Sequence, residues 1–359
     1  MNTADFALPT GHGFVMRGWD FGPAEVAVAV RSHRLLNPAL ELCTNACPWS
    51  CPFCFTEDPS NPDGAKRRLR NELPIQRRLE LIDEVHRLGA RTINVVGAGE
   101  PTIDPHFWRI VEAISARGML PVVYSEASLK LTDPEFVRRL EAVGATVVVK
   151  VNSLWNAAWQ DQVVQGRLPR SGKGYTERRN AAIQTLLDAG FARCSPTRLA
   201  FDTIVCAENL AEIPRLHRWA RDRNIFILLV NYLPSGRSSA EMTGAVGRDQ
   251  QLDLFRELAA VDERHYGLTH AWRFPYGGGV PCTIRGPGLF TKIRGEVLGC
   301  PGESVVLGNL KAEPLAAIWA RMRRFTADFD GGCPPREAFW AGVRAQQSLR
   351  QAAHPKSDD

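Results

Sequence analysis

The amino-acid sequence predicts an α/β fold in which six parallel strands alternate with helices. Between residue 38 and about residue 232, short β-rich runs are followed by helical patterns, and most of the β-rich runs are nearly continuous apolar stretches. Such stretches are typical of parallel strands that are buried on both faces. Parallel strands with right-handed crossovers form an open doubly wound sheet or a partial barrel, and in both the chemistry lies at the carboxyl ends of the strands.

Proline and glycine residues mark where the predicted helices begin and end between the strands. Pro74 stands where the first residue of a crossover helix is expected, and Gly89 ends that helix. Asp133–Pro134 begins a later helix, Gly144 ends it, and Gly190 ends another. The predicted strands are Ala39–Leu42, Arg91–Val96, Leu120–Tyr124, Thr146–Val151, Arg198–Val205 and Ile225–Asn231.

The length and composition indicate a globular protein with more than one domain. The chain has 359 residues, of which 44% are hydrophobic and 23% charged. Glycine and proline become dense and the strand candidates become short from about residue 265. We therefore expect an N-terminal extension (1–37), a core domain (38–240), a small α+β domain (241–345) and a polar tail (346–359).

Charge and cysteine content narrow the class of protein. The net charge of +5 is mild, and the basic run Lys66–Arg70, with Arg77 and Arg78, is interpreted as a solvated helix start, so no nucleic-acid partner is expected. No signal peptide is evident and no apolar run reaches the ~20 residues that span a bilayer, which predicts a cytoplasmic protein without membrane contact. Nine cysteines in a reducing compartment, four of them within residues 43–54, favour metal or cluster ligation over disulfides.

Three of these cysteines have the spacing of a cluster-binding loop. Cys47-x3-Cys51-x2-Cys54 follows the first predicted strand, so one loop can supply three thiolates to a [4Fe–4S] cubane and leave the fourth iron open for a reactant. Phe53 can shield such a cluster from water. A structural zinc site with Cys43 as the fourth ligand is the alternative, although Cys43 is predicted to be a buried structural thiol.

This motif resembles the CxxxCxxC signature of the radical SAM superfamily, which uses S-adenosylmethionine (SAM). The resemblance implies a partial (β/α)6 TIM-type barrel and a SAM-binding [4Fe–4S] cluster. Gly97-Ala98-Gly99-Glu100-Pro101, after the second strand, is similar to the family's Gly-Gly-Glu motif, which binds the methionine amino group, with Ala98 in place of the first glycine. Further SAM-binding candidates at the strand ends are Ser125, Lys150, Asn152, Ser153, Asn231 and Leu233.

The C-terminal cysteines resemble those of a SPASM or shorter twitch domain, as in aminocyclitol dehydrogenases. Cys282-x12-Gly295-x4-Cys300 is followed by a Gly-Asn pair, a helix with a tryptophan, and Cys333-Pro-Pro-Arg336. The resemblance implies one auxiliary [4Fe–4S] cluster on Cys282, Cys300 and Cys333. Arg336 replaces the last cysteine of the family's CxxC, which leaves the fourth ligand open: another side chain, a substrate atom, or none. Three buried cysteines without a cluster are the alternative.

The resemblance also implies a reaction type. Reductive cleavage of SAM gives a 5′-deoxyadenosyl radical that abstracts hydrogen from a substrate C–H bond, with electrons from an external flavodoxin or ferredoxin type of donor. An auxiliary cluster favours a dehydrogenase-type oxidoreductase over an epimerase, decarboxylase or dehydratase. Asp202 and Glu126 are the candidate catalytic bases from their placement.

The substrate is left open between two classes. A small sugar, aminocyclitol or nucleoside intermediate of natural-product (antibiotic) biosynthesis is favoured, because only about 40 residues precede the cysteine loop, too few for a peptide-recognition domain there. A peptide maturase that forms thioether, carbon–carbon or epimerised products is the alternative. From another class, the chain is a non-catalytic Fe–S electron carrier or a zinc-stabilised binding protein.

Overall fold

The structure is a computed structural model. It describes residues 11–56, 64–166, 173–231, 235–239, 244–270, 282–326, 333, 335–338, 340–342 and 344. All nine cysteines lie within these residues.

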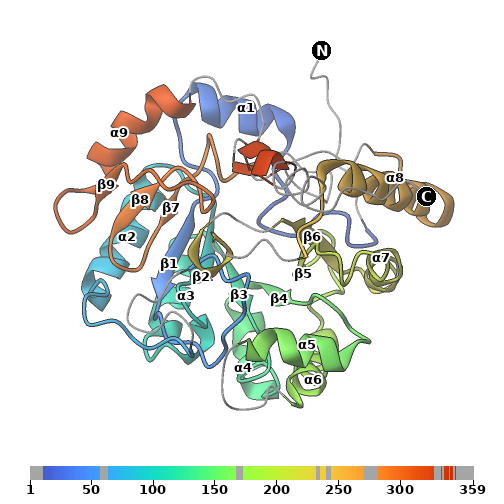
Figure 1. The fold of residues 1–359 in the computed structure, drawn as a ribbon. Coiled ribbons are helices and arrows are strands. Elements are labelled where there is room, and N and C mark those ends of the chain that lie inside the picture. The colour runs from blue at the N-terminus through green and yellow to red at the C-terminus, as the bar shows by residue number, and fades with distance from the viewer. Residues whose placement is uncertain are drawn as a thin grey trace, which may run out of the picture.

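One sheet organises the protein (Figure 1), with the strand order β6-β5-β4-β3-β2-β1-β7-β8-β9. β1 to β6 pair in parallel. All six predicted strands are present, and the predicted α/β partial barrel is confirmed. The bounds are β1 (Ala39–Cys43), β2 (Thr92–Gly97), β3 (Leu120–Ser125), β4 (Thr146–Lys150), β5 (Leu199–Ile204), β6 (Phe226–Val230), β7 (Phe290–Thr291), β8 (Glu296–Leu298) and β9 (Gly308–Asn309).

Helices cover the outer face of the parallel strands (Figure 1) and bury their apolar residues against it. They are α2 (Ile75–Arg87), α3 (Phe107–Ser115), α4 (Pro134–Ala142), α6 (Tyr175–Asp188) and α7 (Ile213–Arg221). α5 (Ala157–Gln165) packs on α6 instead. The short 3-10 helices are η1 (Pro101–Ile103) and η2 (Gly236–Ser239). Because the side chains of a parallel strand alternate between the two faces, the opposite face of the sheet is left to line cavities. Within the described ranges, no helix has the length and apolarity to cross a membrane.

The N-terminal part closes the end of the barrel where the strands begin. Met16 forms an isolated parallel bridge with Thr197, just before β5. Trp19 is buried, and its indole Nε1 donates a hydrogen bond to Oδ1 of Asn94 in β2 at 2.7 Å. The helix α1 (Pro23–Arg31) follows.

The C-terminal strands extend the same sheet beyond β1. β7 pairs in parallel with β1, and the antiparallel strands β8 and β9 follow. The buried Glu41 of β1 accepts a hydrogen bond from the Ile293 backbone at 2.7 Å, and burial raises the pKa of Glu41 to about 7. α9 (Leu315–Thr326) packs beside α2, where the Leu315 backbone donates to Glu84 at 2.7 Å. The C-terminal strands are therefore fixed to the barrel edge.

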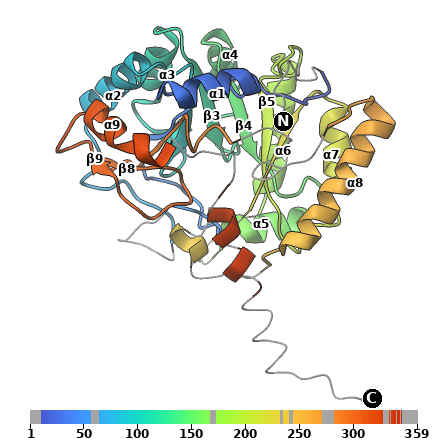
Figure 2. The ribbon, with the colours of Figure 1, turned by 90° about the horizontal axis from the view of Figure 1, so that it is seen from above.

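α8 (Arg248–Tyr266) packs against α7 of the barrel, as seen from above in Figure 2, although it follows the predicted domain boundary at residue 241. The buried Asp262 carboxylate of α8 accepts hydrogen bonds from His217 and Arg221 of α7 and from His270, at 2.5 to 3.0 Å. This long-range ion pair attaches α8 to the core domain, and it left no signal in the local sequence pattern.

Replacing Asp262 with asparagine is expected to destabilise the fold by about 3–5 kcal/mol, because it leaves the Arg221 guanidinium buried without its counter-charge. Bonds from His217, His270 and Arg221 overcome burial and hold the pKa of Asp262 below its ordinary value. The stability from this ionised group is therefore present above about pH 4 and is lost as the pH falls toward the folded-state pKa. Urea unfolding at pH 7 and at about pH 2.5, below the unfolded-state pKa of an aspartate, measures both effects. Asp253→Asn, which removes an exposed pair with Arg256 on the same helix, is the control, and equal losses in the two variants would contradict the prediction.

Candidate functional site

Cys47, Cys51 and Cys54 lie in one loop that follows β1 (residues 44–56, the cysteine loop). All three line a cavity of about 190 Å³, the first cavity, at the carboxyl ends of the barrel strands. Cys43, at the end of β1, belongs to the main hydrophobic core and is fully buried. The prediction that Cys43 is buried is confirmed, and its structural role stays a prediction.

A buried charge network holds the start of the cysteine loop. The Arg78 guanidinium bonds to Glu72 at 3.1 Å and to Asp104 at 3.0 Å. The two carboxylates accept hydrogen bonds from the loop backbone: Asp104 from Thr44 at 2.6 Å, and Glu72 from Asn45 at 2.9 Å. The loop conformation is therefore imposed from beneath by α2 and by the segment after β2.

The turn after β2 packs directly on the cysteine loop. The Gly99 backbone N–H donates to Thr44 O at 3.0 Å, and that of Glu100 donates to Ala46 O at 2.8 Å. A Cβ atom at Gly99 would lie 2.1 Å from Ala46 O, so this approach requires glycine. Gly97, Ala98, Gly99 and Glu100 all line the first cavity, and Pro101 begins η1 behind them.

Lys66 is a buried cation in the wall of the first cavity. Its ammonium group donates to Ala98 O and to the Thr56 hydroxyl, which lies 3.2 Å from the Cys54 sulfur. Burial alone would raise the pKa of Cys54, but Lys66 and Thr56 hold it below its ordinary value. The interpretation of the whole basic run as solvated is wrong for two residues, since Lys66 and Arg78 are 4% and 1% exposed.

Two carboxylates face the cysteines across the first cavity. Glu100 is 2% exposed and accepts hydrogen bonds from Ser125 Oγ at 2.8 Å and from the Glu126 backbone at 2.9 Å. Glu126 accepts from Trp49 Nε1 at 3.0 Å, while its buried Oε1 has no donor among the described residues. Burial raises the pKa of Glu100, and burial together with the Glu100 charge raises the pKa of Glu126 to about 7.

Of the other predicted strand-end residues, some line a cavity and others bond only to the surrounding structure. Lys150 of β4 pairs with Asp202 of β5 at 3.1 Å, and both line the first cavity. Asn152 and Ser153 bond to the scaffold instead: Asn152 Oδ1 accepts from the Ile204 backbone, and Ser153 Oγ donates to Glu212. Neither is among the described cavity-lining residues. Asn231 lies in a second cavity, and Leu233 falls outside the described residues.

The donor set of the first cavity fits a cluster and SAM. Among the described residues, no three Cys, His, Asp or Glu side chains converge tightly enough for one metal ion. A cubane binds its thiolates through different irons, so they need not converge, whereas a zinc site requires convergence. Lys66, Lys150 and Arg237 offer positive charge for a carboxylate, and the buried Glu126 Oε1 offers an acceptor for an ammonium group.

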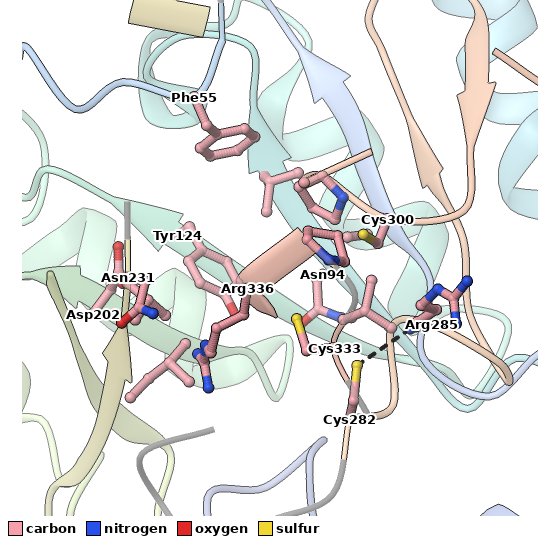
Figure 3. A pocket seen from close by; sticks show the side chains of 18 of the residues that line it. Phe55, Asn94, Tyr124, Asp202, Asn231, Cys282, Arg285, Cys300, Cys333 and Arg336 are labelled. Carbon is pink, nitrogen blue, oxygen red and sulfur yellow. Dashed lines mark hydrogen bonds between the residues drawn. The ribbon is translucent and has the colours of Figure 1, made fainter. Parts of the chain in front are cut away.

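The C-terminal cysteines meet in a second cavity of about 210 Å³ (Figure 3). Cys282, Cys300 and Cys333 all line this cavity, although the first and the last are 51 positions apart in the sequence. Its wall also includes Arg285, whose backbone donates to the Cys282 sulfur at 3.4 Å. Six residues line both cavities, which are therefore neighbours: Phe53, Phe55, Val96, Tyr124, Asp202 and Ile204.

The charges of neighbouring groups affect the pKa values of these three thiols. Burial raises the pKa of Cys300, and Glu303 and the other two thiols raise it further. Burial likewise raises the pKa of Cys333, against the lowering effect of Arg336. Sulfurs that repel each other as thiolates are stabilised by a shared cationic centre, so this set fits an iron–sulfur cluster as well.

Several site residues were not predicted from the sequence. Lys66, Arg237 and Tyr124 line the first cavity, and Trp19 lines the second. Arg237 offered one signal: it lies in the segment after β6, and chemistry lies at the carboxyl ends of the strands. Its backbone donates to Cys54 O at 2.9 Å, so η2 closes over the cysteine loop.

Comparison with known families agrees with this geometry. The sequence profile of the radical SAM superfamily matches residues 42–220, which begin at the end of β1 and include the cysteine loop, the turn after β2 and most of α7. The chain belongs to the radical SAM superfamily. Radical SAM enzymes use a [4Fe–4S] cluster and SAM, so the prediction of a radical SAM enzyme with these two cofactors is confirmed.

Curated relatives are identical to this radical SAM chain at about a quarter of the aligned residues. Mycofactocin maturase MftC of Mycobacterium tuberculosis is 26% identical over 224 residues, which cover 62% of this chain and 51% of the relative. This chain thus spans about half the length of that relative. AdoMet-dependent heme synthase of Methanosarcina barkeri is 26% identical over 311 residues, covering 79% of this chain and 81% of the relative.

Solved structures show the same fold. Streptococcus suis SuiB bound to S-adenosylmethionine superposes with a TM-score of 0.60 at 14% identity, covering 87% of this chain and 77% of SuiB. Native anSMEcpe with bound AdoMet superposes with a TM-score of 0.56 at 10% identity, covering 82% of this chain and 84% of that protein. At these identities the likeness establishes the fold of the radical SAM chain.

Replacing Cys47, Cys51 and Cys54 together with alanine is expected to lower the iron content of the anaerobically reconstituted protein from roughly eight to roughly four atoms per chain, since each cubane holds four irons. Iron and sulfide quantitation measures this change. Cys43→Ala is the control and should retain the wild-type iron content. Bound zinc in place of iron would support the four-cysteine zinc site instead, and iron loss in Cys43→Ala would contradict the interpretation of Cys43 as a structural thiol.

Replacing Gly99 with alanine should disrupt the cysteine loop, because the added Cβ would collide with the carbonyl oxygens of Ala46 and Asn45. We expect a loss of at least about tenfold in SAM cleavage, the size of effect that follows when a reacting group is displaced by about 1 Å. Mass spectrometry of 5′-deoxyadenosine measures the cleavage. Gly22→Ala, where a Cβ meets open space, is the matched control, and equal activity of the two variants would refute this role of Gly99.

Proposed function

We propose that this radical SAM enzyme oxidises a peptide substrate, one apolar side chain of which enters the second cavity. When bound, the cluster and SAM supply a radical that takes a hydrogen atom from a substrate C–H bond. The second cavity shares one wall with the first, so a side chain inside it would lie next to the SAM site. That shared wall is the observation on which the proposal rests.

The lining of the second cavity supports an apolar guest. Most of its residues are apolar or aromatic, including Trp19, Phe55, Leu228 and Ile284. A polyhydroxylated sugar or aminocyclitol needs a polar partner for each hydroxyl group, because an unpaired buried hydroxyl is costly. The lining therefore favours a hydrocarbon or aromatic group over the predicted sugar-like substrate.

The named relatives also support a peptide substrate. The mycobacterial relatives are named maturases, and one solved structure with this fold is SuiB bound to its precursor peptide SuiA (TM-score 0.57). A non-peptide substrate is the second candidate, because the heme synthase relative is matched over a larger share of both chains.

The chain's own residues have separate tasks in this proposal. Cys47, Cys51 and Cys54 would hold the SAM-binding cluster, with Phe53 covering it, and Cys282, Cys300 and Cys333 would hold an auxiliary [4Fe–4S] cluster that accepts an electron. Asp202 lines both cavities and is the better placed of the two predicted bases to take a substrate proton. Glu126 lines the first cavity, where it would bind the SAM amino group.

The test is SAM cleavage by the reconstituted enzyme with dithionite and a panel of substrates. Unmodified peptides with apolar or aromatic residues are expected to stimulate 5′-deoxyadenosine formation at least about tenfold above the rate without substrate, because substrate positions the reacting groups and excludes water. Mass spectrometry follows both 5′-deoxyadenosine and the mass change of the peptide. Stimulation by an aminocyclitol, nucleoside or porphyrin alone would replace the peptide proposal, and no cleavage with any substrate would favour a non-catalytic Fe–S carrier.

A further inference from the structure

The second cavity has an unpaired amide group in its wall. Asn231, directly after β6, is 6% exposed, and its buried Nδ2 donor has no acceptor among the described residues. The end of the strand fixes its position, because the Val230 carbonyl accepts a hydrogen bond from the Val205 backbone at 2.8 Å. Buried amide groups are normally hydrogen-bonded, so an unpaired one marks a place where a ligand atom can accept.

This donor belongs to the substrate side of the site. Among the described lining residues, Asn231 is part of the second cavity and not of the first. The second cavity is the space that the proposed function assigns to the substrate. A substrate atom is therefore the acceptor that the position of Asn231 favours.

An acceptor lies on the same wall of the second cavity. Asp202 of the adjacent strand β5 lines both cavities, and its Oδ2 accepts a hydrogen bond from Lys150 at 3.1 Å. Its other oxygen, Oδ1, can accept a further bond, because a carboxylate accepts at both oxygens. Figure 3 shows Asn231 and Asp202 on the same side of the cavity. The wall thus presents one donor and one acceptor to a ligand.

A donor beside an acceptor selects a ligand group that has both functions. A carboxylate offers only acceptors and an ammonium group only donors, so either would leave one member of the pair without a bond. One residue of an extended peptide points its N–H and its C=O to the same side, as in the hydrogen-bonded pairs of an antiparallel sheet. A hydroxyl group also has both functions, but a compound with several hydroxyls would meet hydrocarbon elsewhere in this cavity.

We propose that Asn231 donates to the C=O, and Asp202 accepts from the N–H, of one extended residue of the substrate peptide. The apolar side chain of that residue occupies the second cavity. This inference rests on the proposed function and deepens it, since the enzyme then recognises the peptide backbone at the residue that it oxidises. The two bonds hold the Cα of that residue beside the wall that the two cavities share.

The test compares N-acetyl-L-phenylalanine N-methylamide with the ester analogue in which oxygen replaces the N–H of phenylalanine, by calorimetric binding to the reconstituted protein in the presence of SAM. The amide should bind at least about tenfold more tightly, because the ester presents no donor to Asp202. Asn231→Leu should weaken the binding of both compounds by a similar factor, since both lose the bond to the C=O. Asn71→Leu, at an exposed position outside both cavity linings, is the control and should leave both affinities unchanged.

A stability measurement separates substrate recognition from a structural role of Asn231. The Asn231 donor has no partner in the protein itself, so Asn231→Leu should leave the urea midpoint of the unliganded protein unchanged or raise it. A residue required for the fold would lower the midpoint, and that result would contradict the proposal.

Equal affinity for the amide and the ester, undetectable binding of both, or unchanged affinity in Asn231→Leu would also overturn it. Tighter binding of 3-phenylpropanol than of the amide would assign the pair to a hydroxyl group instead. Peptide-stimulated SAM cleavage by the wild type is measured in parallel. Stimulation with equal affinities would refute backbone recognition alone, whereas a preserved preference without stimulation would refute oxidation of the peptide alone.

Discussion

The site depends on the backbone contact between the cysteine loop and the turn after β2. β1 and β2 pair in parallel, so the two segments that follow them leave the sheet at the same edge. Two backbone hydrogen bonds then join these segments, from Gly99 to Thr44 O and from Glu100 to Ala46 O. One contact thus sets the position of the three cysteines and of the Glu100 carboxylate together. A change in one segment is transmitted to the other, because no side chain lies between them.

The second cavity arises from the way in which the C-terminal strands continue the sheet. β7 pairs with the free edge of β1, and the hairpin of β8 places Cys300 on the same side as Cys282. Trp19 closes the cavity from the opposite end, where the strands begin. The cavity is therefore bounded by three parts of the chain that are distant in sequence. Its apolar walls exclude water, which suits chemistry that water would intercept.

The sequence was informative wherever a signal was local. Continuous apolar runs identified all six parallel strands, because a strand buried on both faces needs no information from elsewhere in the chain. The spacing of Cys47, Cys51 and Cys54 was informative for the same reason. By contrast, the burial of Lys66 depends on Ala98, and that of Arg78 on Glu72 and Asp104, so their local setting in a basic run was misleading.

The first and second cavities differ in polarity, and the ion pair of Lys150 and Asp202 lies at their junction. The first cavity is lined by several acidic and basic side chains, while the second is lined mainly by hydrocarbon. Lys150 and Asp202 are direct partners in the β4–β5 register, so the sheet itself holds them together at the junction. A carboxylate held there by a neighbouring strand needs little reorganisation when charge moves nearby. The junction between the two cavities is thus set by the backbone pairing of β4 with β5.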